Sequence, residues 1–170
     1  MLLTVIACIM AFLQVIPTKG QDIPSVIKNV YSLIDDGKYS DGYKLIRDID
    51  NQKVEVYGDS MVMVLNYEKG ACLFFLDKYK EAIPFLNDAL LRMEKLPHED
   101  CNYLELIYSI GSCYNHLKQY EKAEEYFRRV IIRGNTQDFT CAITTQTLSE
   151  LAEVYSRLGY NKLADRLSKI

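Results

Sequence analysis

One small residue recurs along this chain at an almost constant interval, and this interval limits the folds that are open to it. The residue is glycine or alanine, and it stands at Gly42, Ala82, Ala123 and Ala164, at steps of 40, 41 and 41 positions. Four units at nearly constant spacing indicate an internal repeat, in which each unit is one supersecondary element that stacks on its neighbours. The fold is therefore expected to be one motif used four times.

Other residues keep the phase of this small residue. Three sets do so: Gly70, Gly111 and Ala152 twelve positions before it, Tyr39, Tyr79 and Tyr120 three before it, and Ile46, Leu86 and Phe127 four after it. Between Leu104 and Leu117, and again between Ala123 and Ile131, apolar residues recur at steps of three and four, which is the period of an amphipathic helix. Each unit is therefore predicted to be two helices joined by a turn.

The small residues are predicted to lie where the two helices of a unit cross. Glycine costs about 1 kcal/mol relative to alanine inside a helix, and it is tolerated where another helix must come close. Gly70 is expected to face Ala82 in this way. We assign the same packing role to all seven small residues of the pattern: Gly42, Gly70, Ala82, Gly111, Ala123, Ala152 and Ala164.

The third unit, "YSIGSCYNHLKQYEKAEEYFRRVI", shows the whole pattern: a small residue and aromatics, a tyrosine at the turn, then alanine and a large apolar residue. This pattern resembles the tetratricopeptide repeat over about residues 23 to 170. The resemblance implies an all-α solenoid of about four helix pairs wound into a right-handed superhelix. The interval of 40 to 41 residues is longer than the usual period of about 34. We expect the first helix of a unit to be longer, because Asp59-Ser60 and Glu99-Asp100 can cap it upstream.

The first twenty residues differ from the rest. An apolar run from Leu2 to Ile16 is shorter than the roughly 20 residues of a membrane span, and it favours a signal peptide cleaved near Gly20/Gln21. The run lacks a preceding Lys or Arg, so an uncleaved anchor and a buried first helix stay open, as does a lipoprotein box ending at Cys8. We predict residues 1–20 as signal or anchor, residues 21–170 as one domain, and a periplasmic or cell-envelope location.

Enzymes, cofactor-binding proteins and nucleic-acid-binding proteins are disfavoured by the sequence. It has two histidines and none of the hydrolase, metalloprotease, P-loop or dinucleotide motifs. A net charge of −3 and the lack of a basic stripe disfavour nucleic acid. We therefore expect no catalysis, no cofactor, and membrane contact only through an uncleaved N-terminal segment.

The cysteines follow the repeat. Cys72 and Cys113 are equivalent to one another, and so are Cys101 and Cys141. Equivalent positions of stacked units lie about 10 Å or more apart, whereas a disulfide needs Cα atoms within about 7 Å. We interpret them as small buried apolar residues. The "HEDC" run at 98–101 could be drawn as a metal site, but a loop at a helix start is the favoured interpretation, and no metal is predicted.

A partner-binding surface is implied by the resemblance, because the first helices of tetratricopeptide arrays line the concave face. The phase of the repeat places seven residues there: Tyr31, Tyr67, Phe74, Tyr108, Ser112, Asn115 and Glu153. This face is aromatic in units one and two and more polar in units three and four. Packing of Phe74 and Phe75 between units is the alternative. A clamp for a C-terminal carboxylate is not expected, because Tyr67, Ala71 and Tyr108 occupy its positions.

Two functions are compatible with these features. The preferred one is an exported scaffold that binds a protein or peptide on its concave face. The alternative is the sensing region of a larger membrane-anchored signalling or transcription regulator. The second helix of unit four is short, and Leu163, Leu167 and Ile170 share one face of it. Self-association through this last pair is therefore also expected.

Overall fold

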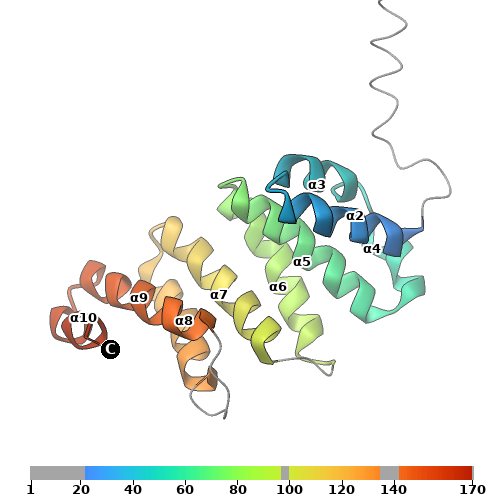
Figure 1. The fold of residues 1–170 in the computed structure, drawn as a ribbon. Coiled ribbons are helices and arrows are strands. Elements are labelled where there is room, and N and C mark those ends of the chain that lie inside the picture. Colours follow the sequence, from blue (N-terminus) through green and yellow to red (C-terminus); the bar gives the residue numbers. More distant parts are fainter. Residues whose placement is uncertain (1–21, 97–99, 135–141, 170) are drawn as a thin grey trace, which may run out of the picture.

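The computed structural model describes residues 22–96, 100–134 and 142–169, and every regular element in these ranges is helical. Four helix pairs follow one another from α2 at one end to α10 at the other, as an elongated array (Figure 1). The pairs are α2 (Ile23–Asp35) with α3 (Tyr39–Ile46), α5 (Asp59–Phe75) with α6 (Tyr79–Met93), α7 (Asp100–His116) with α8 (Tyr120–Gly134), and α9 (Ala142–Arg157) with α10 (Asn161–Leu167). The predicted all-α helical-repeat fold is confirmed.

The interval of the repeat follows from helix length. In units two and three the first helix has 17 residues and the second has 15. The predicted signal or anchor, His98 and Cys141 lie outside the described residues. Within the described ranges, no helix combines the length and the apolar character that crossing a membrane requires.

All four helix pairs close with the same turn. At equivalent positions the backbone takes a left-handed conformation, with φ of 72° at Gly37, 59° at Asp77, 58° at Lys118 and 82° at Gly159. The backbone N–H of the next residue donates to the carbonyl five positions earlier, over 2.7 to 2.9 Å in every unit. This is the Schellman arrangement, which satisfies the free carbonyls at a helix end and starts the next helix in a defined direction.

The glycines of the first helices lie where the second helices cross them, but their partner is not the predicted one. A Cβ atom on Gly70 would lie 2.5 Å from Cδ2 of Leu86, so this glycine faces Leu86 rather than Ala82. A Cβ atom on Gly111 would lie 2.8 Å from ring carbons of Phe127. Both partners stand four residues after the repeated alanine. The helical turn that lies over the glycine is therefore the one that follows the alanine along the second helix.

The other small residues differ in depth. Ala82 and Ala123 are fully buried. Gly42 is also buried, and a Cβ atom there would lie 3.3 Å from Sγ of Cys72, so it supports contact between units as well as within one. Ala152 and Ala164, in the last pair, are only half-buried. Packing around the small residues is therefore tightest in the middle of the array.

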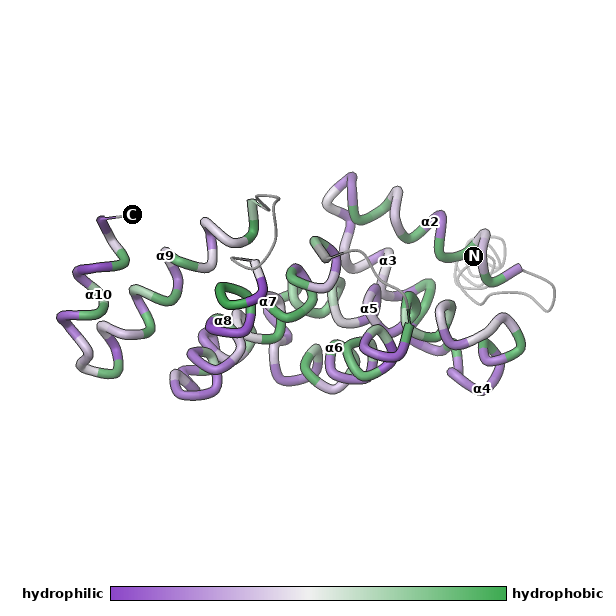
Figure 2. Tube along the Cα trace, turned by 90° about the horizontal axis from the view of Figure 1, so that it is seen from below, coloured by the Kyte–Doolittle hydropathy of each residue, from purple (hydrophilic) through white to green (hydrophobic). Residues whose placement is uncertain are grey.

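The core runs along the array as two clusters of buried side chains that meet at α5. One holds residues of α2 to α5, among them Val30 and Leu65, and the other holds residues of α5 to α9, among them Leu104 and Phe127. Figure 2 shows apolar and polar residues alternating around each helix, as expected when every helix buries one face in a one-dimensional stack.

Unit one departs from the predicted pattern. Its second helix, α3, ends at Ile46, and two short helices follow, α4 (Asn51–Val54) and η2 (Glu55–Tyr57). The side chain of Asp50 caps α4 by accepting from the backbone N–H of Gln52 at 3.0 Å. The buried ammonium of Lys69, on α5, donates to the Ile49 carbonyl at 2.6 Å. A backbone carbonyl in the segment between α3 and α4 thus accepts a hydrogen bond from a side chain of the neighbouring unit.

Candidate partner-binding groove

Two adjoining cavities lie along the first helices of the pairs. The first has a volume of about 230 Å³ and is bounded by α2, α5, α6 and α7. The second has a volume of about 390 Å³ and is bounded by α5, α7 and α9. Tyr67 and Glu105 line both cavities, so the two form one continuous surface, which we call the groove.

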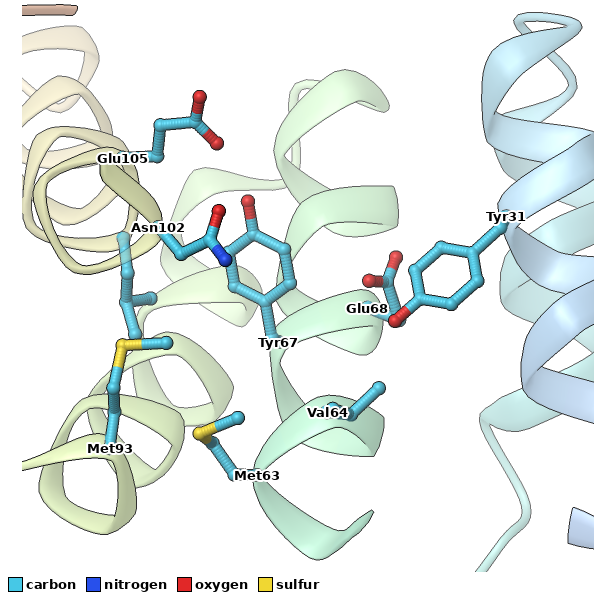
Figure 3. Close-up of a pocket in the computed structure, with 9 residues that line it drawn as sticks. Tyr31, Met63, Val64, Tyr67, Glu68, Met93, Asn102 and Glu105 are labelled. Atoms are coloured by element: carbon cyan, nitrogen blue, oxygen red, sulfur yellow. The ribbon is translucent and has the colours of Figure 1, made fainter. Parts of the chain in front are cut away.

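Tyr67 lies at the centre of the first cavity (Figure 3). Tyr31 of α2 stands on one side of it, and Asn102 and Glu105 of α7 stand on the other, with Met63 and Met93 beside them. Tyr31 is 44% exposed and forms part of the rim, whereas Tyr67 is half-buried. Burial, and secondarily the Glu105 carboxylate, raise the pKa of Tyr67, so its hydroxyl stays neutral at physiological pH.

Glu68 is the unusual residue of the first cavity. It lines the cavity while only 3% of it is exposed. Among the described residues, none forms a hydrogen bond or ion pair with its carboxylate. Burial, and secondarily the negative charge of Asp35, raise the pKa of Glu68 to about 7. A carboxyl in this state is protonated in about half of the molecules at neutral pH.

The second cavity is organised by Tyr108 of α7, which is 9% exposed. Its hydroxyl donates to a carboxylate oxygen of Glu150 and accepts from the side-chain amide of Gln146, both on α9. Its ring stacks on Phe127, with centroids 5.8 Å apart. Burial and then Glu150 raise the pKa of Tyr108. Tyr108 therefore holds unit three against unit four, and only its edge faces the cavity.

An aromatic cluster closes the other end of the second cavity. Phe74 packs edge-on against Phe75 and Tyr79, and Tyr79 stacks on His116 with ring centroids 4.2 Å apart. Phe75 stacks on Tyr39 of unit one, at 4.4 Å, yet remains 50% exposed. Phe74 and Phe75 therefore pack between units, as the alternative interpretation held, and at the same time line the groove together with His116.

The groove collects five of the seven residues predicted to bind a partner. Tyr31 and Tyr67 line the first cavity, and the second is lined by Tyr67, Phe74, Tyr108 and Ser112. Asn115 and Glu153 line neither cavity. Glu153 is exposed and pairs with Arg157 at 3.2 Å, one helical turn further along α9. The groove thus contains the middle of the predicted face and not its C-terminal end, and partner binding by these residues stays a prediction.

Sequence reasoning missed the acidic residues of the groove, which are Glu68, Glu105 and Glu150. A signal for two of them was present, because Glu68 and Glu150 share one phase of the repeat, fourteen positions before the recurring alanine. Within the described ranges, no lysine or arginine lines either cavity. The groove therefore combines aromatic rings with negative charge.

The cysteines offer no reactive site among the described residues. Cys72 and Cys113 are buried and free, and burial raises the pKa of each thiol to about 12. A thiol in this state is a poor nucleophile and a poor metal ligand. Cys101 is half-buried. Within the described part of the chain, no three His, Cys, Asp or Glu side chains gather in a way that could hold a metal ion.

Stacked helix pairs joined by one repeated turn, with a groove along the first helices, define a helical-repeat fold. Residues 61–131, which include the whole of α6 and α7, match the sequence model of the tetratricopeptide repeat family, and the chain has the tetratricopeptide-repeat-like fold. No curated protein sequence matches the chain significantly.

Solved structures resemble the whole array. A putative kinesin light chain with tetratricopeptide-like repeats from Podospora anserina has a TM-score of 0.70 at 14% identity, covering 86% of this chain and 71% of that one. MamA has a TM-score of 0.67 at 18% identity, covering 87% and 75%. MamA from Desulfovibrio magneticus RS-1 has a TM-score of 0.65 at 19% identity, covering 87% and 72%. At these identities the likeness concerns the fold.

Proposed function

We propose that this chain is a non-catalytic scaffold that binds a segment of another protein along the groove. The observation that carries the proposal is that the groove runs along the first helices of units one to four, with Tyr67 shared by both cavities. Helical-repeat folds use such extended surfaces to bind other proteins. Tyrosine supplies large, rigid contact area with a polar edge, and it is enriched among the residues that dominate binding energy.

The test is a selection of peptides from a random displayed library on the full-length chain, followed by affinity measurements with variants. Tyr67→Ala is expected to weaken the selected peptides at least tenfold, in line with the loss of about 1.4 kcal/mol or more at a central aromatic contact. Tyr57→Ala is the matched control, because Tyr57 is 46% exposed on η2 and lines neither cavity. Equal binding to wild type and to Tyr67→Ala would place the binding surface elsewhere.

Tyr67 is a better probe than Tyr108 for this purpose. Truncation of Tyr108 would also remove its hydrogen bonds to Glu150 and Gln146, and so it would loosen α9 as well as the groove. Among the described residues, none forms a hydrogen bond with the Tyr67 hydroxyl, so truncation of Tyr67 leaves the hydrogen bonds between α7 and α9 intact. Circular dichroism of each variant should show unchanged helicity.

We further propose that the scaffold acts outside the cytoplasm, because the apolar run from Leu2 to Ile16 has the length of a signal sequence. Expression of the full chain with a C-terminal tag, fractionation, and N-terminal sequencing test this. Export with a mature end at Gln21 is the expected result. A chain retained in the cytoplasm with Met1 intact would overturn this part of the proposal, and would leave the binding activity untouched.

A further inference from the structure

We propose that the first cavity receives a basic side chain, preferably arginine, from the bound protein segment. This proposal rests on the proposed function, and it names the chemistry that the groove recognises. Its basis is a mostly buried carboxylate with no partner among the described residues, placed between two tyrosine rings in a cavity that no described lysine or arginine lines.

The carboxylate is that of Glu68. Glu68 as a residue is 3% exposed, its carboxylate oxygens keep some access to the cavity, and no described residue donates to them or pairs with them. A buried carboxylate without a partner is costly, and such groups are normally paired or hydrogen-bonded. A guanidinium group supplies several N–H donors in a planar fork that matches a carboxylate. The missing partner of Glu68 is therefore a cation delivered from outside the chain.

The chain's own nearest cation is directed elsewhere. Lys69 follows Glu68 directly, but its ammonium donates to the Ile49 carbonyl at 2.6 Å and lies 5.5 Å from the ring centroid of Phe85. Lys69 thus supports the break after α3 and does not neutralise Glu68. Neither Lys69 nor any other lysine or arginine of the described residues lines the cavity.

The walls of the cavity suit an arginine side chain. The rings of Tyr31 and Tyr67 stand on either side of the Glu68 carboxylate in Figure 3. Tyrosine rings attract cations that lie over their faces, and guanidinium groups also stack on them. Met63 and Met93 offer polarizable apolar surface to the methylene stem. A volume of about 230 Å³ accommodates one side chain, and not a folded element.

Every titratable group that faces Glu68 favours a cation. Asp35 and Tyr31 approach it from α2, Tyr67 and Cys72 flank it on α5, and Glu105 approaches Tyr67 from α7. These groups are either neutral or negative, and α6 contributes only Met93 to this cavity. A cation that enters therefore displaces the proton of Glu68, because the ionised carboxylate is the form that binds it. Binding is expected to strengthen as pH rises through 7.

The experiment is a titration of the ¹⁵N-labelled full chain with N-acetyl-arginine amide, followed by NMR. N-acetyl-citrulline amide is the matched control ligand, because it has the same shape without the charge. The arginine probe is expected to shift the amide signals of residues 63–68 and 102–106 saturably, and to bind at least tenfold more tightly than the citrulline probe. Its affinity should increase about tenfold from pH 5.5 to pH 8.

Two variants complete the test. Glu68→Gln, which preserves side-chain size, should reduce the affinity for the arginine probe about tenfold and remove the pH dependence. Glu125→Gln, an exposed position on α8, should change neither. Equal binding of the two probes, unchanged binding by Glu68→Gln, or shifts spread over the whole surface would overturn the proposal. If selected peptides still bind wild type tightly and Tyr67→Ala weakly, the proposed function stands without it.

Discussion

At the scale of single residues, the repeated turn shows where the chain carries avoidable strain. The left-handed residue is glycine in units one and four, but it is Asp77 and Lys118 in units two and three. The left-handed conformation costs a residue with a Cβ atom roughly 1–2 kcal/mol. Replacing that residue with glycine recovers only part of this, because glycine increases the conformational entropy of the unfolded chain. Asp77 is supported locally, since its carboxylate accepts from the Tyr79 hydroxyl at 2.5 Å.

We predict that Lys118→Gly raises the free energy of unfolding by about 0.5–1 kcal/mol, because it removes the Cβ conflict at φ 58°. Urea denaturation followed by circular dichroism measures the change. Gly37→Lys is the reciprocal control, and it should lower stability by a similar amount. A destabilised Lys118→Gly would mean that the lysine side chain contributes more than its backbone conformation costs.

The second prediction at this scale concerns pH. The pKa of Glu68 is raised to about 7 in the folded state from an ordinary value of 4.5. A raised pKa means that the folded state holds the proton more tightly, so this contribution to stability is complete below pH 4.5 and is lost as pH rises through 7. Glu68→Gln should therefore match the wild type near pH 4.5 and exceed it at pH 8, by an amount on the order of 3 kcal/mol. A stability difference that does not vary with pH would contradict this account.

At the scale of helices, close approach within a pair depends on the glycine of the first helix. Gly111 has ring carbons of Phe127 2.8 Å and Cβ of Tyr126 3.1 Å from the position of a Cβ atom. The aromatic neighbours are held in turn by Tyr108 and Tyr114, which stack on them. The second helix of this pair therefore cannot yield to a larger residue without moving several rings.

We predict that Gly111→Ala lowers the free energy of unfolding by about 1–3 kcal/mol and that Gly111→Leu lowers it by more, because both overpack the crossing of α7 and α8. Thermal unfolding followed by circular dichroism is the measurement. At an unobstructed helical position the alanine variant would be more stable than wild type by about 1 kcal/mol. The sign of the change for alanine alone therefore decides whether α7 and α8 meet at this residue.

At the scale of the whole molecule, the two ends of the array differ. At the N-terminal end, α4 and η2 follow the first pair and bury Val54 completely. At the other end, α10 has seven residues, and no described helix covers its outer side. Tyr160 is 51% exposed and Leu163 is 43% exposed. Helical-repeat arrays need polar outer faces at their ends to stay soluble.

We predict that the chain self-associates through α9 and α10. Light scattering across a concentration series should show a rising mean mass, and Leu163→Glu combined with Leu167→Glu should abolish the rise without loss of stability. Val56→Glu is the control, because Val56 is 82% exposed at the opposite end of the array. A wild-type chain that stays monomeric at all concentrations would show that the short α10 is a sufficient cap.

The sequence by itself determined the repeat, the helix pairs and the glycines at the crossings, though not the partners of those glycines, because the repeat and the helices depend on short-range periodicity. An apolar period of three and four residues specifies a helix wherever it occurs, and a glycine in its stripe marks a close neighbour. The turn tyrosines and the recurring small residue therefore placed the helix pairs. The second helix of unit one was the exception: it ends early, at Ile46, and the Ile49 carbonyl beyond it accepts from Lys69, twenty residues further along the chain.

Only the tertiary structure decided what the groove contains. Tyr108 was predicted as a partner contact, but Glu150 and Gln146, about forty residues further along the chain, bind its hydroxyl. Glu68 reads in the sequence as one more helical charge, and it becomes a buried carboxylate only because α2 and α7 enclose it with α5. The burial of a side chain and the charges around it depend on helices that are distant in the sequence. A local pattern of residue types therefore does not reveal them.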